Sequence, residues 1–264
     1  MTIELNGATV YYEQHGQGQP TLVLHGWGGK CESFAPLLRD CADALHMTAL
    51  DFPGHARSSD PPEPWSVTEY MEMTAQLLRA LSIPRAHIVA HSFGGRVALA
   101  LAATYPELVG RMVLTGVPGL KTTPPPARKA RSAMYRALKA LLDNRLTRAW
   151  LGNARIDALR GRLQEKFGSA DYRALSPEMR KTFSRVVTQD LTPYLSRISA
   201  PTLLFWGDQD TAAPLWMGRA MEKGITDAGL VVMEGAGHFA YLDRYADFRA
   251  VVRNFLCESA GGER

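Results

Sequence analysis

The chain has 264 residues, of which 46% are hydrophobic and 21% charged, and its formal net charge is +4. This composition is ordinary for a globular protein, and the length suits one domain or one domain with a large insertion. No apolar run approaches the roughly 18 residues of a membrane span, and the first residues lack the features of a secretory signal. The three cysteines match no metal-site spacing, which predicts reduced thiols and a cytoplasmic protein without a metal site.

The first third of the chain alternates between strand and helix patterns. Asn6-Gly7 separates two alternating runs and predicts an opening β-hairpin. Apolar strands are predicted at 21–24 and 47–50, and helices at 33–44 and 67–81, where apolar residues recur at helical spacing. Strands and helices that alternate with short connections indicate a mostly parallel sheet covered by helices on both faces.

The stretch Ile88-Val89-Ala90-His91-Ser92-Phe93-Gly94-Gly95 joins a buried strand pattern to an Ala- and Leu-rich helix pattern. Ser92 would then lie at a sharp turn, with the small residues Ala90 and Gly94 two positions before and after it. Small residues suit that turn because the two backbones pass close together and the serine itself is strained. The pattern is typical of a nucleophile elbow, which exposes the serine hydroxyl above the sheet. The alternative interpretation is a helix for which Ser92 is only the N-cap.

A further apolar strand is predicted at 112–114. The strand pattern then stops after Pro118 and is replaced by helical apolar spacing as far as about residue 190. Pro124-Pro125-Pro126 stiffens the chain where this segment begins. We therefore predict a helical insertion over 119–190 and a core domain formed by 1–118 together with 191–264.

The sheet pattern returns in the last quarter of the chain. Apolar strands are predicted at 201–206 and 230–233, and a helix at 245–256 closes the core domain. With the earlier strands, the predicted sheet has about eight strands. Each late strand runs into a turn with polar side chains, which are Asp208 and Asp210 after the first strand and His238 after the second.

Ser92, one of these aspartates and His238 are candidates for a catalytic set. A serine hydroxyl is a weak nucleophile at neutral pH and needs a base. His238 would take the serine proton and later return one to the leaving group. The other histidines, including His25 and His91, are interpreted as structural. For His91 the reason is that its side chain cannot share the outward direction of its neighbour Ser92. The chain order Ser, Asp, His differs from the orders in chymotrypsin and subtilisin.

With the glycine-rich stretch His25-Gly26-Trp27-Gly28, these motifs make the sequence resemble the serine hydrolases of the α/β-hydrolase fold over nearly the whole chain. A plain glycine-rich turn is the alternative interpretation of that stretch. The resemblance implies the α/β-hydrolase fold, with the insertion as a cap after the sixth strand. Ala90 departs from the family pattern, which usually has glycine at that position of the elbow.

The resemblance also implies roles for individual residues. The backbone N–H groups of Trp27 and Phe93 would form the oxyanion hole, and no metal or organic cofactor would be needed. The family pattern Gly-x-x-Asp favours Asp210 as the acid of the triad, with Asp208 as a turn residue.

Within this family the sequence resembles carboxylic esterases, such as the biotin-pathway pimeloyl-carrier methyl esterase, and the meta-cleavage carbon–carbon hydrolases. We predict hydrolysis of carboxylic esters through an acyl-enzyme on Ser92. The alternatives are a carbon–carbon bond hydrolase or perhydrolase-like enzyme with the same triad, and a non-catalytic binding protein. A serine at position 92 argues against dehalogenases and epoxide hydrolases, which have an aspartate there.

Basic residues are concentrated in the predicted insertion, since 16 Lys and Arg but only 6 Asp and Glu lie between Leu120 and Asp190. One interpretation is that they form the solvated outer faces of amphipathic helices. The other is that they attract an anionic substrate or an acidic carrier protein. No nucleic-acid-binding motif accompanies them, so a nucleic acid is not predicted as a partner.

Overall fold

A computed structural model gives the structure of the protein and describes residues 1–121, 156 and 175–257. The chain divides into two compact units, one formed by Met1–Leu120 with Lys181–Arg264 and the other by Lys121–Arg180. Most of the predicted insertion over 119–190 lies outside the described residues, so its role as a cap stays a prediction. No helix in the described part of the chain is long and apolar enough to cross a membrane.

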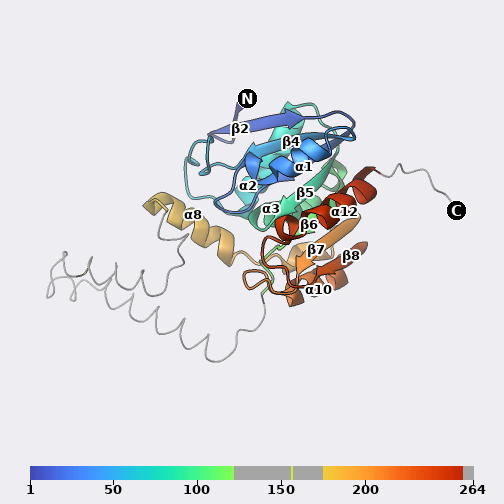
Figure 1. The fold of residues 1–264 in the computed structure, drawn as a ribbon. Helices are drawn as coiled ribbons and strands as arrows, with labels where there is room; N and C mark the ends of the chain where they lie inside the picture. The colour runs from blue at the N-terminus through green and yellow to red at the C-terminus, as the bar shows by residue number, and fades with distance from the viewer. Residues whose placement is uncertain (122–155, 157–174, 258–264) are drawn as a thin grey trace. The chain divides into compact units, whose positions relative to one another are not determined.

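An eight-stranded sheet forms the centre of the first unit (Figure 1), which confirms the predicted number of strands. Its strand order is β1-β2-β4-β3-β5-β6-β7-β8. Neighbouring strands are parallel from β4 to β8, whereas β2 runs antiparallel to β1 and β4. The strands are β1 (Thr2–Leu5), β2 (Ala8–His15), β3 (Gln19–Leu24), β4 (Leu45–Asp51), β5 (Ala86–His91), β6 (Val109–Thr115), β7 (Thr202–Gly207) and β8 (Ala228–Met233).

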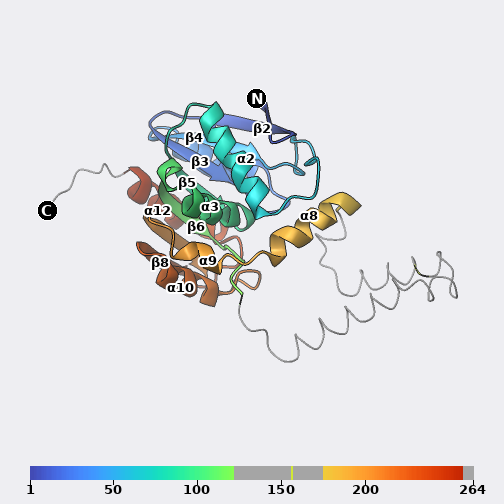
Figure 2. The ribbon, with the colours of Figure 1, turned by 180° about the vertical axis from the view of Figure 1, so that it is seen from behind.

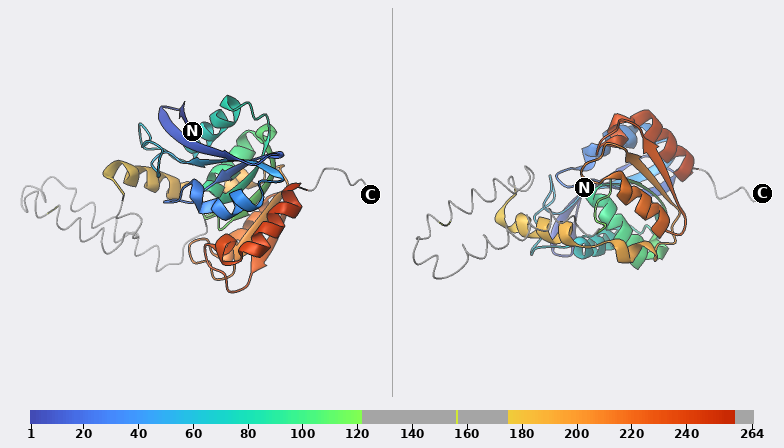
Figure 3. Two further views of the ribbon diagram at one scale, coloured as in Figure 1. Left: turned by 45° about the horizontal axis from the view of Figure 1, so that its top comes forward. Right: turned by 90° about the horizontal axis from the view of Figure 1, so that it is seen from below.

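Helices cover both faces of this sheet, as two further views show (Figure 3). The face turned to the viewer in Figure 2 carries α2 (Val67–Ala80), α3 (Phe93–Thr104), α9 (Thr192–Leu195) and α10 (Leu215–Gly224). The opposite face carries η1 (Cys31–Phe34), α1 (Ala35–Asp40), α11 (Ala240–Asp243) and α12 (Tyr245–Cys257). The remaining helices are η2 (Pro106–Leu108) and α8 (Pro177–Thr188).

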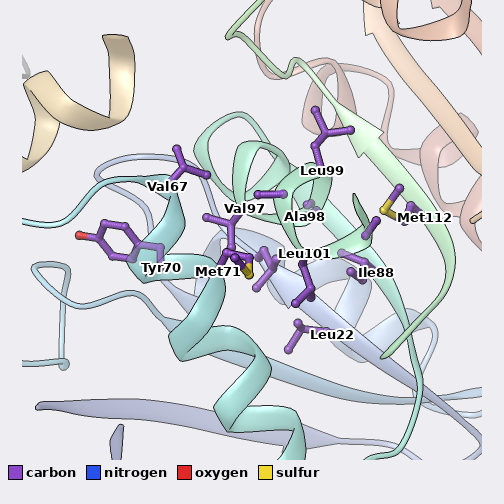
Figure 4. Packing of buried hydrophobic residues seen from close by; sticks show 14 of the residues in the cluster. Leu22, Val67, Tyr70, Met71, Ile88, Val97, Ala98, Leu99, Leu101 and Met112 are labelled. Carbon is purple, nitrogen blue, oxygen red and sulfur yellow. The ribbon is translucent and has the colours of Figure 1, made fainter. Parts of the chain in front are cut away.

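Successive residues of a strand enter two separate apolar layers because they point to opposite faces of the sheet. Leu22 of β3 and Ile88 of β5 join the layer with α2 and α3 (Figure 4). Val23 and Val89 join the layer with α1 and α12. This burial on both faces fixes the positions of the strand ends from which the candidate site is built.

The helix predicted at 33–44 is shorter and more irregular in the structure. It consists of the 3-10 helix η1 followed by α1, which ends at Asp40. The N–H groups of Gln17 and Gln19 donate to the carbonyls of Ala42 and Ala44 at 3.0 and 3.1 Å. The backbone beyond Asp40 therefore pairs with the β2–β3 loop instead of continuing the helix, a long-range contact that local spacing does not encode.

The two ends of the predicted insertion lie side by side where they join the sheet. Leu191 N–H donates to Gly119 O at 3.0 Å. Arg96 of α3 is buried and donates to Val186 O at 2.9 Å, at the C-terminal end of α8. A Cβ on Gly119 would lie 3.0 Å from Arg96 Nη1, so glycine leaves room for the guanidinium. The chain thus leaves and rejoins the core at one place, just after β6.

Candidate active site

Ser92 lies between β5 and α3 in the strained backbone that an elbow requires. Its φ is +50° and its ψ is −109°, a conformation that costs a non-glycine residue about 1–3 kcal/mol. A Cβ on Gly94 would lie 2.4 Å from the carbonyl oxygen of Leu24, so no other residue fits there. Ala90 is fully buried in the apolar layer. The elbow therefore forms with alanine at the position where the family usually has glycine.

The structure brings Ser92, His238 and Asp210 into one hydrogen-bonded chain. Ser92 Oγ lies 3.1 Å from His238 Nε2, and His238 Nδ1 lies 2.8 Å from Asp210 Oδ2. A carboxylate only accepts hydrogen bonds, so Nδ1 carries the proton and the Nε2 lone pair accepts the serine O–H. The serine thus donates to the histidine and the histidine to the aspartate, an arrangement that suits removal of the serine proton by His238.

The turn after β7 fixes the Asp210 carboxylate. Its Oδ1 accepts the backbone N–H groups of Ala212 and Ala213, both at 2.8 Å, and its side chain is fully buried. The other aspartate of this turn, Asp208, accepts the N–H of Gly235 at 2.8 Å instead. The two aspartates thus differ in function within the turn, since Asp210 faces His238 while Asp208 braces the turn after β8.

His25 controls the orientation of the peptide between Gly26 and Trp27. Its Nε2 accepts the N–H of Phe52 at 2.9 Å, so its proton lies on Nδ1, which donates to Gly26 O at 2.7 Å. Gly29 N–H donates to the same carbonyl at 2.9 Å. In a trans peptide the N–H points opposite to the C=O, so the two bonds also fix the direction of Trp27 N–H.

The loop 25–29 lies against the elbow. A Cβ on Gly26 would lie 3.3 Å from Ser92 Cβ, and Gly94 N–H donates to His25 O at 3.1 Å. Phe93 is the first residue of α3, where backbone N–H groups have no partner within the helix. Neither Trp27 N–H nor Phe93 N–H has an acceptor in the part of the chain that the structure describes. Both predicted oxyanion donors are therefore available beside the serine.

Aromatic side chains surround this side of the elbow. The Trp27 ring contacts His55, Phe93 and Phe183, with ring centroids 4.7, 5.2 and 5.0 Å away. On the other side, Phe239 follows His238 and is 51% exposed. These aromatic side chains suit an apolar group next to the reacting carbonyl.

Among the described residues, no group of three or more His, Cys, Asp and Glu is arranged to hold a metal ion.

His25 and His91, which the sequence analysis interprets as structural, are both buried beside the site and bond main-chain groups there. Burial lowers the pKa of each imidazole to about 3, so both are neutral donors near neutral pH. His91 Nε2 donates to the backbone carbonyl of His238 at 3.0 Å. The motif that contains His25 offered a signal for its role, whereas nothing in the sequence links His91 to a residue 147 positions away.

Residues 19–245 match the family model described as alpha/beta hydrolase fold. The chain belongs to this family. This α/β hydrolase is 29% identical over 275 residues to the 2-hydroxy-6-oxo-6-phenylhexa-2,4-dienoate hydrolase of Comamonas testosteroni. The alignment covers 96% of this chain and 93% of that one. It is 30% identical to the 2-hydroxy-6-oxononadienedioate/2-hydroxy-6-oxononatrienedioate hydrolase of Burkholderia vietnamiensis, covering 94% and 90% of the two chains.

Solved structures of other α/β hydrolases also resemble this chain. Est816, described as an N-acyl homoserine lactone degrading enzyme, superimposes with a TM-score of 0.72 at 25% identity. The match covers 97% of this chain and 100% of that one. The protein is a hydrolase of this fold, and its relatives act on different kinds of carbonyl compound.

Proposed function

We propose that this α/β hydrolase breaks a carbon–carbon bond next to a ketone, with Ser92 as nucleophile, His238 as base and Asp210 as the acid that orients it. The hydrogen-bonded chain of these three side chains carries the assignment of roles. The relatives named as hydrolases of 2-hydroxy-6-oxo acids support the choice of bond. This order reverses the sequence prediction, in which ester hydrolysis was the first choice and carbon–carbon hydrolysis the alternative.

The names of those relatives define the chemistry. A 2-hydroxy-6-oxo-6-phenylhexa-2,4-dienoate has a ketone and a carboxylate but no ester or amide. Hydrolysis must therefore break the carbon–carbon bond between the ketone carbon and the dienoate chain. The carbon at this bond is a vinyl carbon of the diene, so a proton must first move from the 2-hydroxyl group to that carbon, which gives the 2-oxo tautomer. The group that then leaves is a dienolate, whose negative charge is delocalised onto the 2-oxo oxygen.

The site has the parts for this reaction. His238 removes the Ser92 proton as Oγ attacks the ketone carbon, and the N–H groups of Trp27 and Phe93 stabilise the oxyanion. Collapse of the tetrahedral intermediate formed from the 2-oxo tautomer breaks the carbon–carbon bond and releases the dienolate, and protonated His238 supplies the proton that the dienolate oxygen takes up. Water then attacks the acyl-enzyme with His238 as base, which releases a carboxylic acid and restores the Ser92 hydroxyl.

The charge of the insertion favours an anionic substrate. The relative from Burkholderia vietnamiensis is named for dioates, which carry two carboxylates. In this chain, 16 Lys and Arg between Leu120 and Asp190 would attract such a substrate. An acidic carrier protein at the same segment stays a prediction, because most of these residues lie outside the described part.

Ester hydrolysis is the second candidate function. A lactone is a cyclic ester, and Est816 is described as degrading one. The same nucleophile, base and oxyanion donors serve an ester carbonyl, for which an alkoxide replaces the carbon leaving group. The bond that is broken therefore depends on the substrate that the site admits.

A direct comparison of two substrates tests the proposal. Loss of 2-hydroxy-6-oxo-6-phenylhexa-2,4-dienoate and formation of benzoate are measured beside hydrolysis of p-nitrophenyl butyrate. We expect kcat/KM to be at least about 10²-fold higher for the dienoate, and Ser92→Ala to lower both activities by about 10⁴-fold or more. The matched control Ser196→Ala changes an exposed serine and should leave both activities unchanged. Faster ester hydrolysis would assign the second function, and no turnover of either substrate would overturn the carbon–carbon proposal.

A further inference from the structure

His91 lies between the nucleophile and the base without belonging to the triad. It is the last residue of β5, directly before Ser92, and its side chain is buried. Its ring lies 4.8 Å from the His238 ring and 4.9 Å from the Tyr241 ring, measured between centroids. It thus points to the opposite side of the strand from the Ser92 hydroxyl and beneath the turn that carries His238.

The His91 side chain holds the main chain of His238. Its Nε2 lies 3.0 Å from the His238 carbonyl oxygen, and a carbonyl only accepts, so Nε2 carries the proton. In the described part of the chain, no other hydrogen bond reaches the backbone N–H or C=O of His238. The neighbouring residues of the turn are bonded elsewhere, such as Gly237 N–H to Asp243 Oδ2 at 3.1 Å.

Gly116 lies close to the same carbonyl. A Cβ on Gly116 would lie 3.1 Å from His238 O, from His238 Nδ1 and from Asp210 Oδ2. A side chain at position 116 would therefore crowd the His238 turn, which glycine allows to pack close to the end of β6. A turn that packs against Gly116 and is hydrogen-bonded to His91 keeps Nε2 within reach of Ser92 Oγ.

We propose that His91 is a positioning residue, which aligns His238 with Ser92 by binding the main-chain carbonyl of the base. This role rests on the proposed function of His238. Since kcat depends on the alignment of the base in both acylation and deacylation, loss of the bond should lower kcat and leave KM nearly unchanged. A displacement of about 1 Å can cost about 10²-fold in rate.

Three substitutions at His91 separate positioning from stability. His91→Leu removes the donor, His91→Gln places an amide N–H near the position of Nε2, and His91→Asn places it near Nδ1. Labelling of Ser92 with a fluorophosphonate, carried to completion, counts the folded sites, and kcat is expressed per labelled site. We expect His91→Leu and His91→Asn to lower kcat by about 10²-fold and His91→Gln to stay within about fivefold of the unchanged protein.

The control is Phe248→Leu, a change in the apolar layer with α1 and α12. The Phe248 ring lies 5.8 Å from the ring of Tyr241, which also contacts His91. This change should lower Tm and leave kcat per labelled site unchanged. If His91→Leu does not fold, the comparison of His91→Gln with His91→Asn decides, and equal kcat values would overturn the proposal. Unchanged kcat in all His91 variants, with Ser92→Ala inactive, would overturn the role of His91 alone. An active Ser92→Ala would instead overturn the proposed function.

Discussion

Two loops meet at Ser92, and each is held by a buried neutral histidine in a different way. The loop 25–29 carries the Trp27 N–H and is held by His25, which bonds its own neighbour Gly26. The loop 234–239 carries His238 and is held by His91, which belongs to a strand 147 positions earlier in the chain. In the first loop the histidine thus donates within its own loop, although it also accepts the N–H of Phe52, whereas in the second loop the donor comes from the strand that ends next to Ser92.

This difference separates two requirements of catalysis. An oxyanion donor is a backbone group, so a short glycine-rich motif can orient it locally. His238, the proposed base, must be aligned with Ser92 at the end of another strand, so its position depends on contacts between distant segments. We expect changes in the first loop to act on stabilisation of the oxyanion, and changes in the second to act on proton transfer.

The largest expected effect is on Asp210, the proposed acid, which lies on the turn after β7 and contacts His238 of the second loop. Asp210→Asn offers His238 the wrong hydrogen-bonding partner and favours the wrong tautomer, so kcat should fall by about 10⁴-fold. Asp208→Asn is the matched control, because its amide oxygen can still accept from Gly235 N–H, and it should change kcat by less than about threefold. Steady-state kinetics of the two variants measure both values, and a larger loss in Asp208→Asn would reverse the assignment.

The next effect tests the first loop through His25. His25→Leu removes the donor to Gly26 O and the acceptor for Phe52 N–H, which frees the Gly26–Trp27 peptide to rotate. Loss of one oriented oxyanion donor costs about 10²- to 10³-fold in kcat. The measurement is kcat per fluorophosphonate-labelled site.

The conservative variants should show opposite preferences at the two histidines. His25 donates from Nδ1, which asparagine imitates, whereas His91 donates from Nε2, which glutamine imitates. His25→Asn should therefore retain more activity than His25→Gln, the reverse of the order at His91. The same order at both positions would show that side-chain size, and not the hydrogen bond, controls activity.

The smallest expected effect is on stability as a function of pH. Burial lowers the pKa of His25 and of His91 to about 3, while the unfolded chain binds these protons near the reference pKa of about 6.5. Between these values the unfolded state binds more protons, so the free energy of unfolding falls as pH falls, and the full contribution is present above about 6.5. Each imidazole adds about 1.4 kcal/mol per pH unit to this slope.

Urea unfolding of the unchanged protein and of His91→Gln measures this slope. The measurements are made between about pH 4 and 6, which lies between the pKa values of the folded and unfolded states. Glutamine does not titrate, so the curve of the variant should be shallower by about the contribution of one imidazole. The other titrating groups are the same in both proteins and cancel in the difference. Parallel curves would show that His91 is not a buried neutral imidazole.

The local parts of the site could be predicted from short sequence motifs. The elbow around Ser92 and the turn around Trp27 were predicted because each depends on small residues at fixed spacings, and the structure has a positive φ at Ser92 as expected. The alternating strand and helix patterns predicted the parallel sheet, since periods of two and of 3.6 residues follow from the backbone alone.

Contacts between distant groups could not be predicted from these motifs and depend on the folded chain. The family pattern favoured Asp210 over Asp208, but the folded turn determines that the Asp210 carboxylate faces His238 while the Asp208 carboxylate accepts Gly235 N–H. The end of α1 at Asp40 and the bond from His91 to His238 likewise depend on segments that approach only in the folded protein. A hydrogen bond depends on distances and directions to within about an ångström, and these follow from packing of the whole sheet rather than from neighbouring residues.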